Sequence, residues 1–497
     1  MIDLSNLAKY RENNRLEMKK AAGGLPKSIW ETYSAFANTN GGIIVLGVEE
    51  LPDKSFRVSG LDNPEKLILD FWNVMHDRDK ISVNLLSERD VRVEAVDGRK
   101  IIIINVSRAR LQDRPVYLNK DYLNHSYRRN GEGDYKCTPA EVRSMLRDAE
   151  PSTQDMLVLS KMPLSVFDND SVRRYRNRLD AARPAHVWKE LDNMDFLYKL
   201  GCIDRDAATG ALHPTAAGLL MFGHDYEIVK EYPNYFLDYQ EHYEDGDSET
   251  RWTDRFCSST GEWSGNLYDF FVQVSGKITL DVKRPFKLAD DGFTRIDDTP
   301  VHKALREALA NCLVNADYYG ERGLVIKKWR DRIEFANPGN FRVGLEEALS
   351  GGVSQPRNSV LLKMLTLINI GERAGSGIPS ILSVWEKQGW VQPEYKESFN
   401  PDRTILALSF SSAKTDGTRN GTRNGTRNES ISQVDNLIYE YIHAEKPATA
   451  AQIAEAVGKS PRTVKRSLSV LQALNLIQKV GSDKSGQWEA VFDFINN

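Results

Sequence analysis

The residues of this sequence best suited to chemistry lie in the stretch 301–319, where one carboxylate and two carboxamides recur every four residues. Glu307, Asn311 and Asn315 would stand on consecutive turns of one helix face, because side chains four apart along an α-helix lie above one another. Together they could hold a hydrated metal ion and the phosphate tail of a nucleotide. Apolar residues at helical spacing predict the buried stripe of the same helix: Ala304, Leu305, Ala308, Leu309, Cys312 and Leu313.

Glycine-rich turns follow this helix at two points. Two β-like runs, 324–328 and 332–335, lead into the turn Asn337-Pro338-Gly339, and a later turn, 371–377, contains Gly375 and Gly377. A polar helix face followed by such turns is typical of a nucleotide site without a Walker loop. The pattern G-x-x-x-x-G-K-[ST] is absent from the sequence, which argues against a P-loop ATPase. The alternative is an ordinary amphipathic helix followed by loops.

This order of motifs resembles the divergent GHKL-type (Bergerat) ATP-binding domain of bacterial regulators. In that family R-E-A-x-x-N-A-x-x-H-R-D-Y is followed by N-P-G, then R-N, then G-x-G. The matching residues here are Arg306, Glu307, Asn311, Asp317, Tyr318, Asn337, Pro338, Gly339, Arg357, Asn358, Gly375 and Gly377.

The resemblance implies ATP and Mg²⁺ as cofactors, with Glu307 orienting a water molecule and Asn311 helping to hold the ion. It also implies that the turns 337–339 and 375–377 contact adenine and phosphates. The sequence departs from the family pattern where Asn315 and Ala316 replace His-Arg. Asn337 stands nearest the place of the adenine-reading aspartate, which is missing. We therefore expect nucleotide binding rather than hydrolysis.

A second group of candidate residues lies near the start of the chain, where Glu12, Glu17 and Lys19 are followed by Glu49-Glu50. By spacing alone, two glutamates five apart are typical of a solvated surface pair. Basic side chains scattered along a sequence usually increase solubility. The basic residues of this region are Lys19, Lys20, Arg108, Arg114, Arg128 and Arg129.

The stretch from about residue 10 to residue 145 nevertheless resembles the Schlafen AlbA-type domain. Three pieces carry the resemblance: E-x-x-x-x-E-x-K over 12–19, A-F-A-N-x-x-G-G over 35–42 and G-V-E-E over 47–50. It implies a surface that binds nucleic acid, to which we assign Arg128 and Arg129.

In the nuclease members of that family, two glutamates and a later acidic residue form a metal-dependent RNase site. Those positions fall on Glu12, Glu17 and Glu50 here. Three carboxylates can hold one or two hard cations that activate water, and Lys19 could neutralise the phosphate under attack. Glu50 replaces the more usual aspartate, so we favour binding over cleavage.

The C-terminal residues 432–497 have the pattern of a winged helix. Helices are expected over 434–444, 449–457 and 461–474, and two wing strands over 476–480 and 488–492. The third helix resembles the recognition helix of bacterial transcription regulators, whose N-terminal half contacts bases and phosphates. The candidate DNA-binding residues are Arg462, Thr463, Lys465 and Arg466, with Lys484 in the wing. The alternative is a winged helix used for protein contacts.

The fold class we predict is a multidomain α/β protein with an added winged helix. Residues 1–148 form the AlbA-type domain, with a helix over 26–36, strands over 43–48, 91–96 and 100–106, and a capped helix starting at Thr138. Residues 149–300 form a connecting region, with helices over 165–179, 187–200 and 267–278. Residues 301–411 form the ATP-binding-like domain, and 412–431, with three G-T-R-N units, form a flexible linker.

Composition agrees with a globular protein, with 40% hydrophobic and 27% charged residues and a net charge of −4 over 497 residues. The sequence predicts a cytoplasmic protein without membrane contact, because it has four cysteines without paired spacing, no signal core and no run of 18 apolar residues.

The function predicted is a nucleotide-responsive, DNA-binding transcriptional regulator, working as a homodimer. The alternative is a metal-dependent, Schlafen-like ribonuclease acting on RNA in stress or phage defence. Enzymatic activity, either a weak ATPase or that nuclease, stays open.

Overall fold

The computed structural model describes residues 15–131, 133–242, 252–282, 298–371, 375–399 and 401–412. In the C-terminal part it describes 438–439, 441–442, 449–457, 459–473, 477–480 and 487–490. The chain forms two compact units, Met1–Lys414 and Thr415–Asn497. The mixed α/β multidomain class predicted from the sequence is confirmed.

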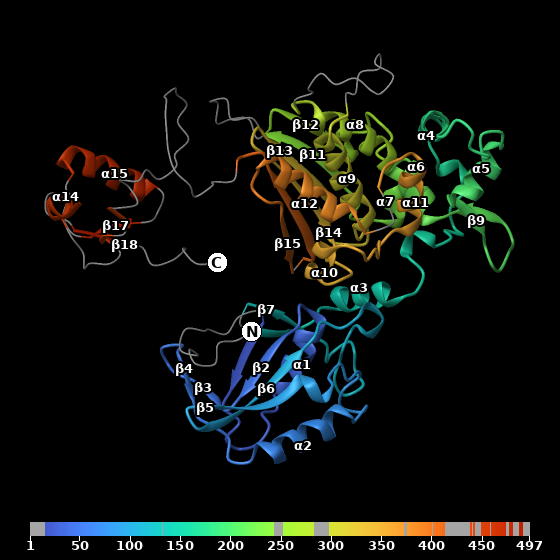
Figure 1. Cartoon of the computed structure of the whole chain (residues 1–497). Helices are drawn as coiled ribbons and strands as arrows, with labels where there is room; N and C mark the ends of the chain where they lie inside the picture. The colour runs from blue at the N-terminus through green and yellow to red at the C-terminus, as the bar shows by residue number, and fades with distance from the viewer. Residues whose placement is uncertain are drawn as a thin grey trace. The chain divides into compact units, whose positions relative to one another are not determined.

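The first unit begins with a four-stranded sheet in the order β1-β2-β6-β5, in which β1 runs parallel to β2 and the other pairs are antiparallel (Figure 1). Its strands are β1 (Leu16–Lys19), β2 (Gly42–Leu46), β5 (Val91–Val96) and β6 (Arg99–Val106). The run Ile101–Ile104 alternates between two apolar cores, because successive side chains of a strand point to opposite faces. Helices α1 (Ile29–Asn38) and α2 (Pro64–Met75) bury apolar residues in one of these cores.

Two hairpins and a helix complete the N-terminal domain. The hairpins pair β3 (Val48–Glu50) with β4 (Phe56–Val58) and β7 (Tyr127–Asn130) with β8 (Gly133–Lys136). Helix α3 (Pro139–Ala149) starts as predicted, because the Thr138 hydroxyl accepts from the Glu141 amide and the Glu141 carboxylate accepts from the Thr138 amide.

A six-stranded sheet in the order β12-β11-β13-β14-β16-β15 forms the centre of the remaining chain. Its strands are β11 (Leu237–His242), β12 (Asp254–Cys257), β13 (Leu324–Trp329), β14 (Arg332–Pro338), β15 (Glu394–Ser398) and β16 (Arg403–Ser409). Strands β11 and β12 come from the region expected to be a connector. The buried residues of β11 share one core with those of β13, β14 and β16, and the half-buried Phe256 of β12 packs against this core. The boundary expected at residue 300 therefore falls inside one sheet and one core.

The helices around this sheet begin where side chains cap them. Asp168 accepts from the amides of Asp170 and Ser171, and Asp192 accepts from that of Asp195, so two predicted helices start later than expected. The elements are α4 (Asn169–Ala182), α5 (Asn193–Leu200), β9 (Ile203–Arg205), β10 (Leu212–Pro214), α6 (Ala216–Phe222), α7 (Asp225–Glu231), α8 (Leu267–Thr279), α9 (Pro300–Asn315), α10 (Leu345–Ser350), α11 (Ser359–Leu367) and α12 (Gly377–Gln388). Helix α9 contacts α8, α11, α12 and β14.

The second unit contains α14 (Ala450–Val457), α15 (Pro461–Ala473) and an antiparallel pair, β17 (Ile477–Val480) and β18 (Gln487–Ala490). Ile453, Val464, Leu468 and Leu471 are buried in its core, as helical periodicity requires. The G-T-R-N repeats, Leu474 and Lys484 lie outside the described residues. No helix in the described part of the chain is long and apolar enough to cross a bilayer.

Candidate nucleotide site

Helix α9 carries the polar residues expected to bind a nucleotide, and both of its ends are fixed by side chains. The Thr299 hydroxyl accepts from the His302 amide, and Pro300 occupies the first turn. At the other end, the Asn358 carboxamide donates to the carbonyls of Val314 and Ala316, each at 2.9 Å. The predicted apolar stripe is confirmed, since all six of its residues are buried.

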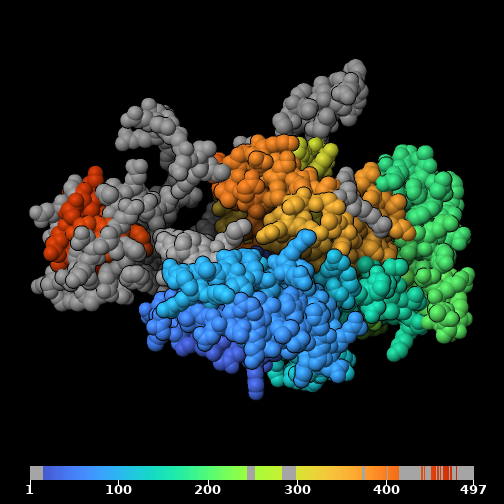
Figure 2. Space-filling model, turned by 60° about the horizontal axis from the view of Figure 1, so that its bottom comes forward, coloured from blue at the N-terminus to red at the C-terminus, as the bar shows by residue number. Residues whose placement is uncertain are grey.

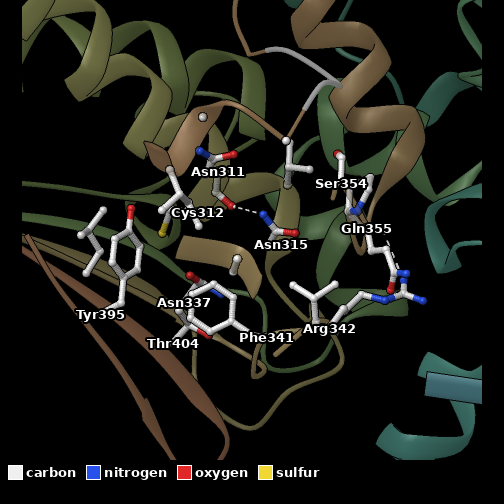
Figure 3. A pocket seen from close by; sticks show the side chains of 18 of the residues that line it. Asn311, Cys312, Asn315, Asn337, Phe341, Arg342, Ser354, Gln355, Tyr395 and Thr404 are labelled. Carbon is white, nitrogen blue, oxygen red and sulfur yellow. Dashed lines mark hydrogen bonds between the residues drawn. The ribbon is translucent and has the colours of Figure 1, made fainter. Parts of the chain in front are cut away.

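The polar face of α9 opens into a cavity. Glu307, Asn311 and Asn315 all line it, and Figure 3 shows the side chains of Asn311 and Asn315 at the cavity. The Asn311 carboxamide donates to Glu307 Oε1 at 3.2 Å, and the Asn315 carboxamide donates to the Asn311 carbonyl at 3.0 Å. The four-residue spacing in the sequence therefore does place these three residues in one site.

The remaining walls of the cavity come from the sheet and from three loops. The space not filled by protein atoms is about 1020 Å³, including the open mouth. Among the other lining residues are Phe335, Asn337, Tyr395, Thr404 and Leu406 from the sheet, Asn340, Phe341, Arg342 and Val343 from the loop after β14, Val353, Ser354, Gln355 and Pro356, and Gly375, Gly377 and Ile378.

The second glycine turn brings backbone directly against the polar face of α9. A Cβ atom on Gly377 would stand 2.3 Å from Glu307 Oε1 and 2.9 Å from the Asn311 side-chain nitrogen. Gly375 has a φ of +67°, and a Cβ there would stand 2.7 Å from the Val353 carbonyl oxygen. Gly375 therefore requires glycine for both its conformation and its close approach to backbone, whereas a side chain at position 377 would press on the ends of the Glu307 and Asn311 side chains.

Gly339 differs from the other residues predicted to touch the cofactor, because it is not part of the cavity lining. Its amide donates to the Asp402 carbonyl at 2.9 Å, and its carbonyl accepts from the Thr404 hydroxyl at 2.9 Å. Its φ of +90° turns the chain at the end of β14. Gly339 positions the neighbouring loop, whereas Asn337 lines the cavity itself.

Two residues that line the cavity, and that residue spacing in the sequence did not identify, have buried polar side-chain atoms without a hydrogen-bond partner in the described part of the chain. Both side-chain polar atoms of Asn340 and the Tyr395 hydroxyl are buried without a hydrogen-bond partner in the described part of the chain. Burial raises the pKa of Tyr395, with a further contribution from Glu307, so its hydroxyl stays protonated and can donate. Buried polar atoms without partners are costly, and a polar ligand would satisfy them.

The donor set fits a magnesium–nucleotide complex. A carboxylate and carboxamide oxygens are hard ligands of the kind Mg²⁺ uses together with phosphate oxygens and water. The described residues contain no cluster of three His, Cys, Asp or Glu side chains that could hold a metal unaided. In this cavity Asn311 would help to hold the ion together with the nucleotide phosphates, and Glu307 would orient a water molecule. Phe335, Phe341 and Tyr395 offer apolar surface to a base.

Two of the acidic residues predicted for a nuclease, Glu17 and Glu50, form ion pairs with basic side chains. Glu17 Oε1 accepts from Lys19 at 2.7 Å, and Glu17 Oε2 lies 2.8 Å from Arg129 Nη2. Lys19 faces Glu17 because residues two apart share one side of a strand. Glu50 instead pairs with Lys54 at 3.0 Å, and Glu12 lies outside the described residues. Both oxygens of Glu17 therefore already face cations in the described part of the chain.

Arg128 and Arg129 are buried, so their assignment to a nucleic-acid surface was wrong. Arg128 Nη1 donates to Asp402 at 2.6 Å and to Glu141 at 3.2 Å. Arg129 pairs with Glu17 and with Asp134. Buried guanidinium groups must be paired, and these two form internal ion pairs instead of a basic surface.

Four of the five DNA-binding candidates in the C-terminal unit lie on α15. Thr463, Lys465 and Arg466 are exposed near the start of α15, opposite the buried Val464 and Leu468. Arg462 belongs to the same helix, and Lys484 lies outside the described residues.

Three protein-family models match: "Schlafen, AlbA_2" over residues 12–138, a domain of unknown function over 143–238, and "Putative ATP-dependent DNA helicase recG C-terminal" over 322–405. The last match covers β13, β14, β15 and the start of β16, and it begins after α9. No curated protein is similar enough to count as a match.

Two solved structures are similar to this chain, one over most of its length and one over about a quarter of it. The DIP2311 protein from Corynebacterium diphtheriae is 15% identical, over 96% of this chain and 95% of that one, with a TM-score of 0.39. The N-terminal domain of a RecG-related protein from Nitrosomonas europaea is 28% identical, over 28% of this chain and 95% of that one, with a TM-score of 0.22. The family matches show that the chain carries a Schlafen AlbA-type domain and a RecG C-terminal-like ATPase domain, a pairing that suggests a nucleic-acid-related function.

Proposed function

We propose that the protein is a nucleotide-responsive DNA-binding transcriptional regulator that binds Mg·ATP in the α9 cavity. The observation that carries this proposal is the polar face of Glu307, Asn311 and Asn315, which lines one cavity directly beneath the Gly375–Gly377 turn. In this proposal Asn311 helps to hold Mg²⁺ and Glu307 orients a water molecule. Nucleotide shifts an equilibrium between two arrangements of the domains and so changes DNA affinity.

The DNA-binding part of the proposal rests on α15. Its exposed Thr463, Lys465 and Arg466 lie in the N-terminal half of the helix, where recognition helices contact bases and phosphates. A single recognition helix reads few base pairs, so we propose a homodimer that binds two half-sites. The AlbA-type domain provides a second nucleic-acid-related element, and we place the protein in the cytoplasm.

Asn311→Ala tests the nucleotide site. We expect the affinity for Mg·ATP to fall by roughly 10- to 150-fold, because a hydrogen bond to a charged group contributes about 1.5–3 kcal/mol. Isothermal titration calorimetry of the full chain measures this, with Lys303→Ala on the exposed side of the same helix as the control. Equal affinities in the wild type and Asn311→Ala would contradict the assignment, and no heat with the wild type would remove the site altogether.

A double substitution, Lys465→Ala with Arg466→Ala, tests DNA binding. Each lysine or arginine that neutralises a phosphate adds about 0.9 to the slope of the logarithm of the binding constant against the logarithm of the salt concentration. We therefore expect the size of this slope to fall by about two units, and duplex affinity to fall at every salt concentration. Gel retardation of duplex DNA and of RNA, with and without ATP, measures both quantities. Arg173→Ala with Lys189→Ala removes the same charge from exposed positions elsewhere and should change neither. Unaltered DNA retardation by the α15 variant would contradict the proposed recognition helix.

A further inference from the structure

One wall of the α9 cavity lies against the N-terminal domain. In Figure 2 the N-terminal domain, in blue, lies against the ATPase-like domain, in yellow and orange. The contacts between them, within the first unit, involve α3 and the loop that follows β6. The ion pairs across this boundary join Arg15 to Glu346, Arg108 to Glu397, Arg128 to Asp402, Arg147 to Asp317 and Asp148 to Arg357. Except for the exposed Arg15–Glu346 pair, these pairs are buried or half-buried, so the boundary is a specific contact.

Arg108 contacts the cavity wall itself. Its Nη2 donates to the carbonyl oxygen of Phe341 at 2.8 Å, and its Nη1 lies 3.4 Å from Glu397 Oε2. Glu397 Oε1 in turn accepts from the amide of Phe341 at 2.7 Å. The side chains of Arg108 and Glu397 are only 13% and 4% exposed, so together they hold both backbone polar groups of Phe341 away from water.

The neighbours of Phe341 are held in the same way. Arg342 donates from Nη2 to the Asp148 carbonyl at 3.0 Å and from Nη1 to the Pro356 carbonyl at 3.3 Å. The Asp148 carboxylate pairs with Arg357, whose Nη2 donates to the Asn340 carbonyl at 3.0 Å. Three consecutive residues of the cavity wall are therefore fixed by the N-terminal domain, directly or through one side chain.

This wall lies outside the regular secondary structure of the ATPase-like domain. Strand β14 ends at Pro338 and α10 begins at Leu345, so residues 339–344 belong to no helix or sheet. Asn340, Phe341 and Arg342 nevertheless line the cavity, and Asn340 presents its unpaired side chain there. A loop without a backbone ladder takes its position from such contacts.

We propose that Arg108 is a positioning residue of the nucleotide cavity, through which the N-terminal domain sets the cavity wall and nucleotide occupancy stabilises the docking of that domain. This inference rests on the nucleotide binding proposed above. Because linkage is reciprocal, a nucleotide that binds better to the docked form must tighten the docking by the same factor.

The test compares Arg108→Ala with Arg110→Ala, an exposed arginine two residues away on the same loop. We expect Mg·ATP affinity, measured by calorimetry on the full chain, to fall roughly tenfold in Arg108→Ala, within the range usual for coupling between sites, and to be unchanged in Arg110→Ala. Arg108→Lys should restore part of the loss, since an ammonium group can still donate to the Phe341 carbonyl. Glu397→Gln combined with Arg108→Ala should lose less than the sum of the two single losses.

Hydrogen exchange of the wild type provides a measurement that does not depend on any variant folding. Mg·ATP should slow exchange at the Phe341 amide and also at amides in the 107–110 loop of the N-terminal domain. Protection confined to the ATPase-like domain, or equal affinity in the wild type and a folded Arg108→Ala, would overturn the inference and leave the nucleotide site intact. Absence of nucleotide binding by the wild type would instead refute the proposed function on which the inference rests.

Discussion

Replacing Arg129 with methionine is expected to destabilise the N-terminal domain by about 3–5 kcal/mol, the usual cost of removing one partner from a buried ion pair. The Arg129 side chain is 1% exposed and lies between Glu17, at 2.8 Å, and Asp134, at 2.9 Å. Its guanidinium group also lies 5.3 Å from the centre of the Phe36 ring. Without this cation two carboxylates would stay buried with less compensation, Glu17 with Lys19 alone and Asp134 with the Thr32 hydroxyl.

Urea unfolding followed by circular dichroism measures the loss. Arg173→Met is the matched control, because Arg173 is 70% exposed and pairs on the surface with Asp170; such a pair contributes at most about 1 kcal/mol. A loss in Arg129→Met no larger than that of the control would show that Arg129 is not structural. A selective loss of RNA or DNA binding with full stability would restore the nucleic-acid role expected from the sequence.

The burial of Arg128 and Arg129 explains why the sequence was misread there. Their partners are set by tertiary structure: Arg128 pairs with Asp402, 274 residues away in the chain. Nothing in local spacing distinguishes a basic pair on a surface from one that closes an ion pair between domains. Glu17 is the same case, since its E-x-K spacing predicts a shared strand face with Lys19 but gives no sign of the arginine on the other side.

Elements defined by local periodicity were predicted well. The alternation over residues 91–96 coincides with β5, and the capping pattern at Thr138 coincides with the start of α3. The strand predicted over 43–48 instead ends at Leu46, because Gly47 has a φ of +92° and its carbonyl accepts from the amides of Ser59 and Gly60. The apolar run around Gly47 does not show that this glycine leaves the strand conformation, so the end of the strand could not be predicted.

The candidate site was predicted in part for the same reason. Helical spacing is local, so it identified Glu307, Asn311 and Asn315. Asn340, Phe341 and Tyr395 reach the cavity only because β15 pairs with β16, β16 pairs with β14, and the N-terminal domain holds the loop after β14. The role of β11 and β12 was missed because the parallel pairing of β11 with β13 joins distant segments.

Gly377→Ala should separate the geometry of the nucleotide site from the stability of the fold. A methyl group there would stand 2.3 Å from Glu307 Oε1 and 2.9 Å from the Asn311 side-chain nitrogen. Both atoms end flexible side chains, so they can move aside while the backbone stays in place. Gly377 begins α12 and its φ is not positive, so alanine suits that position. We therefore expect the melting temperature to change little.

The affinity for Mg·ATP should fall by roughly 5- to 150-fold in Gly377→Ala, since extra methyl groups in a packed site cost about 1–3 kcal/mol when the neighbours must keep their positions. Bound nucleotide would require Glu307 and Asn311 to return to the place the methyl group occupies. Gly276→Ala is the control, because Gly276 is exposed within α8 and a Cβ there meets nothing within 4 Å. Calorimetry on both variants decides the matter: wild-type affinity in Gly377→Ala would mean that the nucleotide does not engage these two side chains, and that the α9 face is not the binding surface.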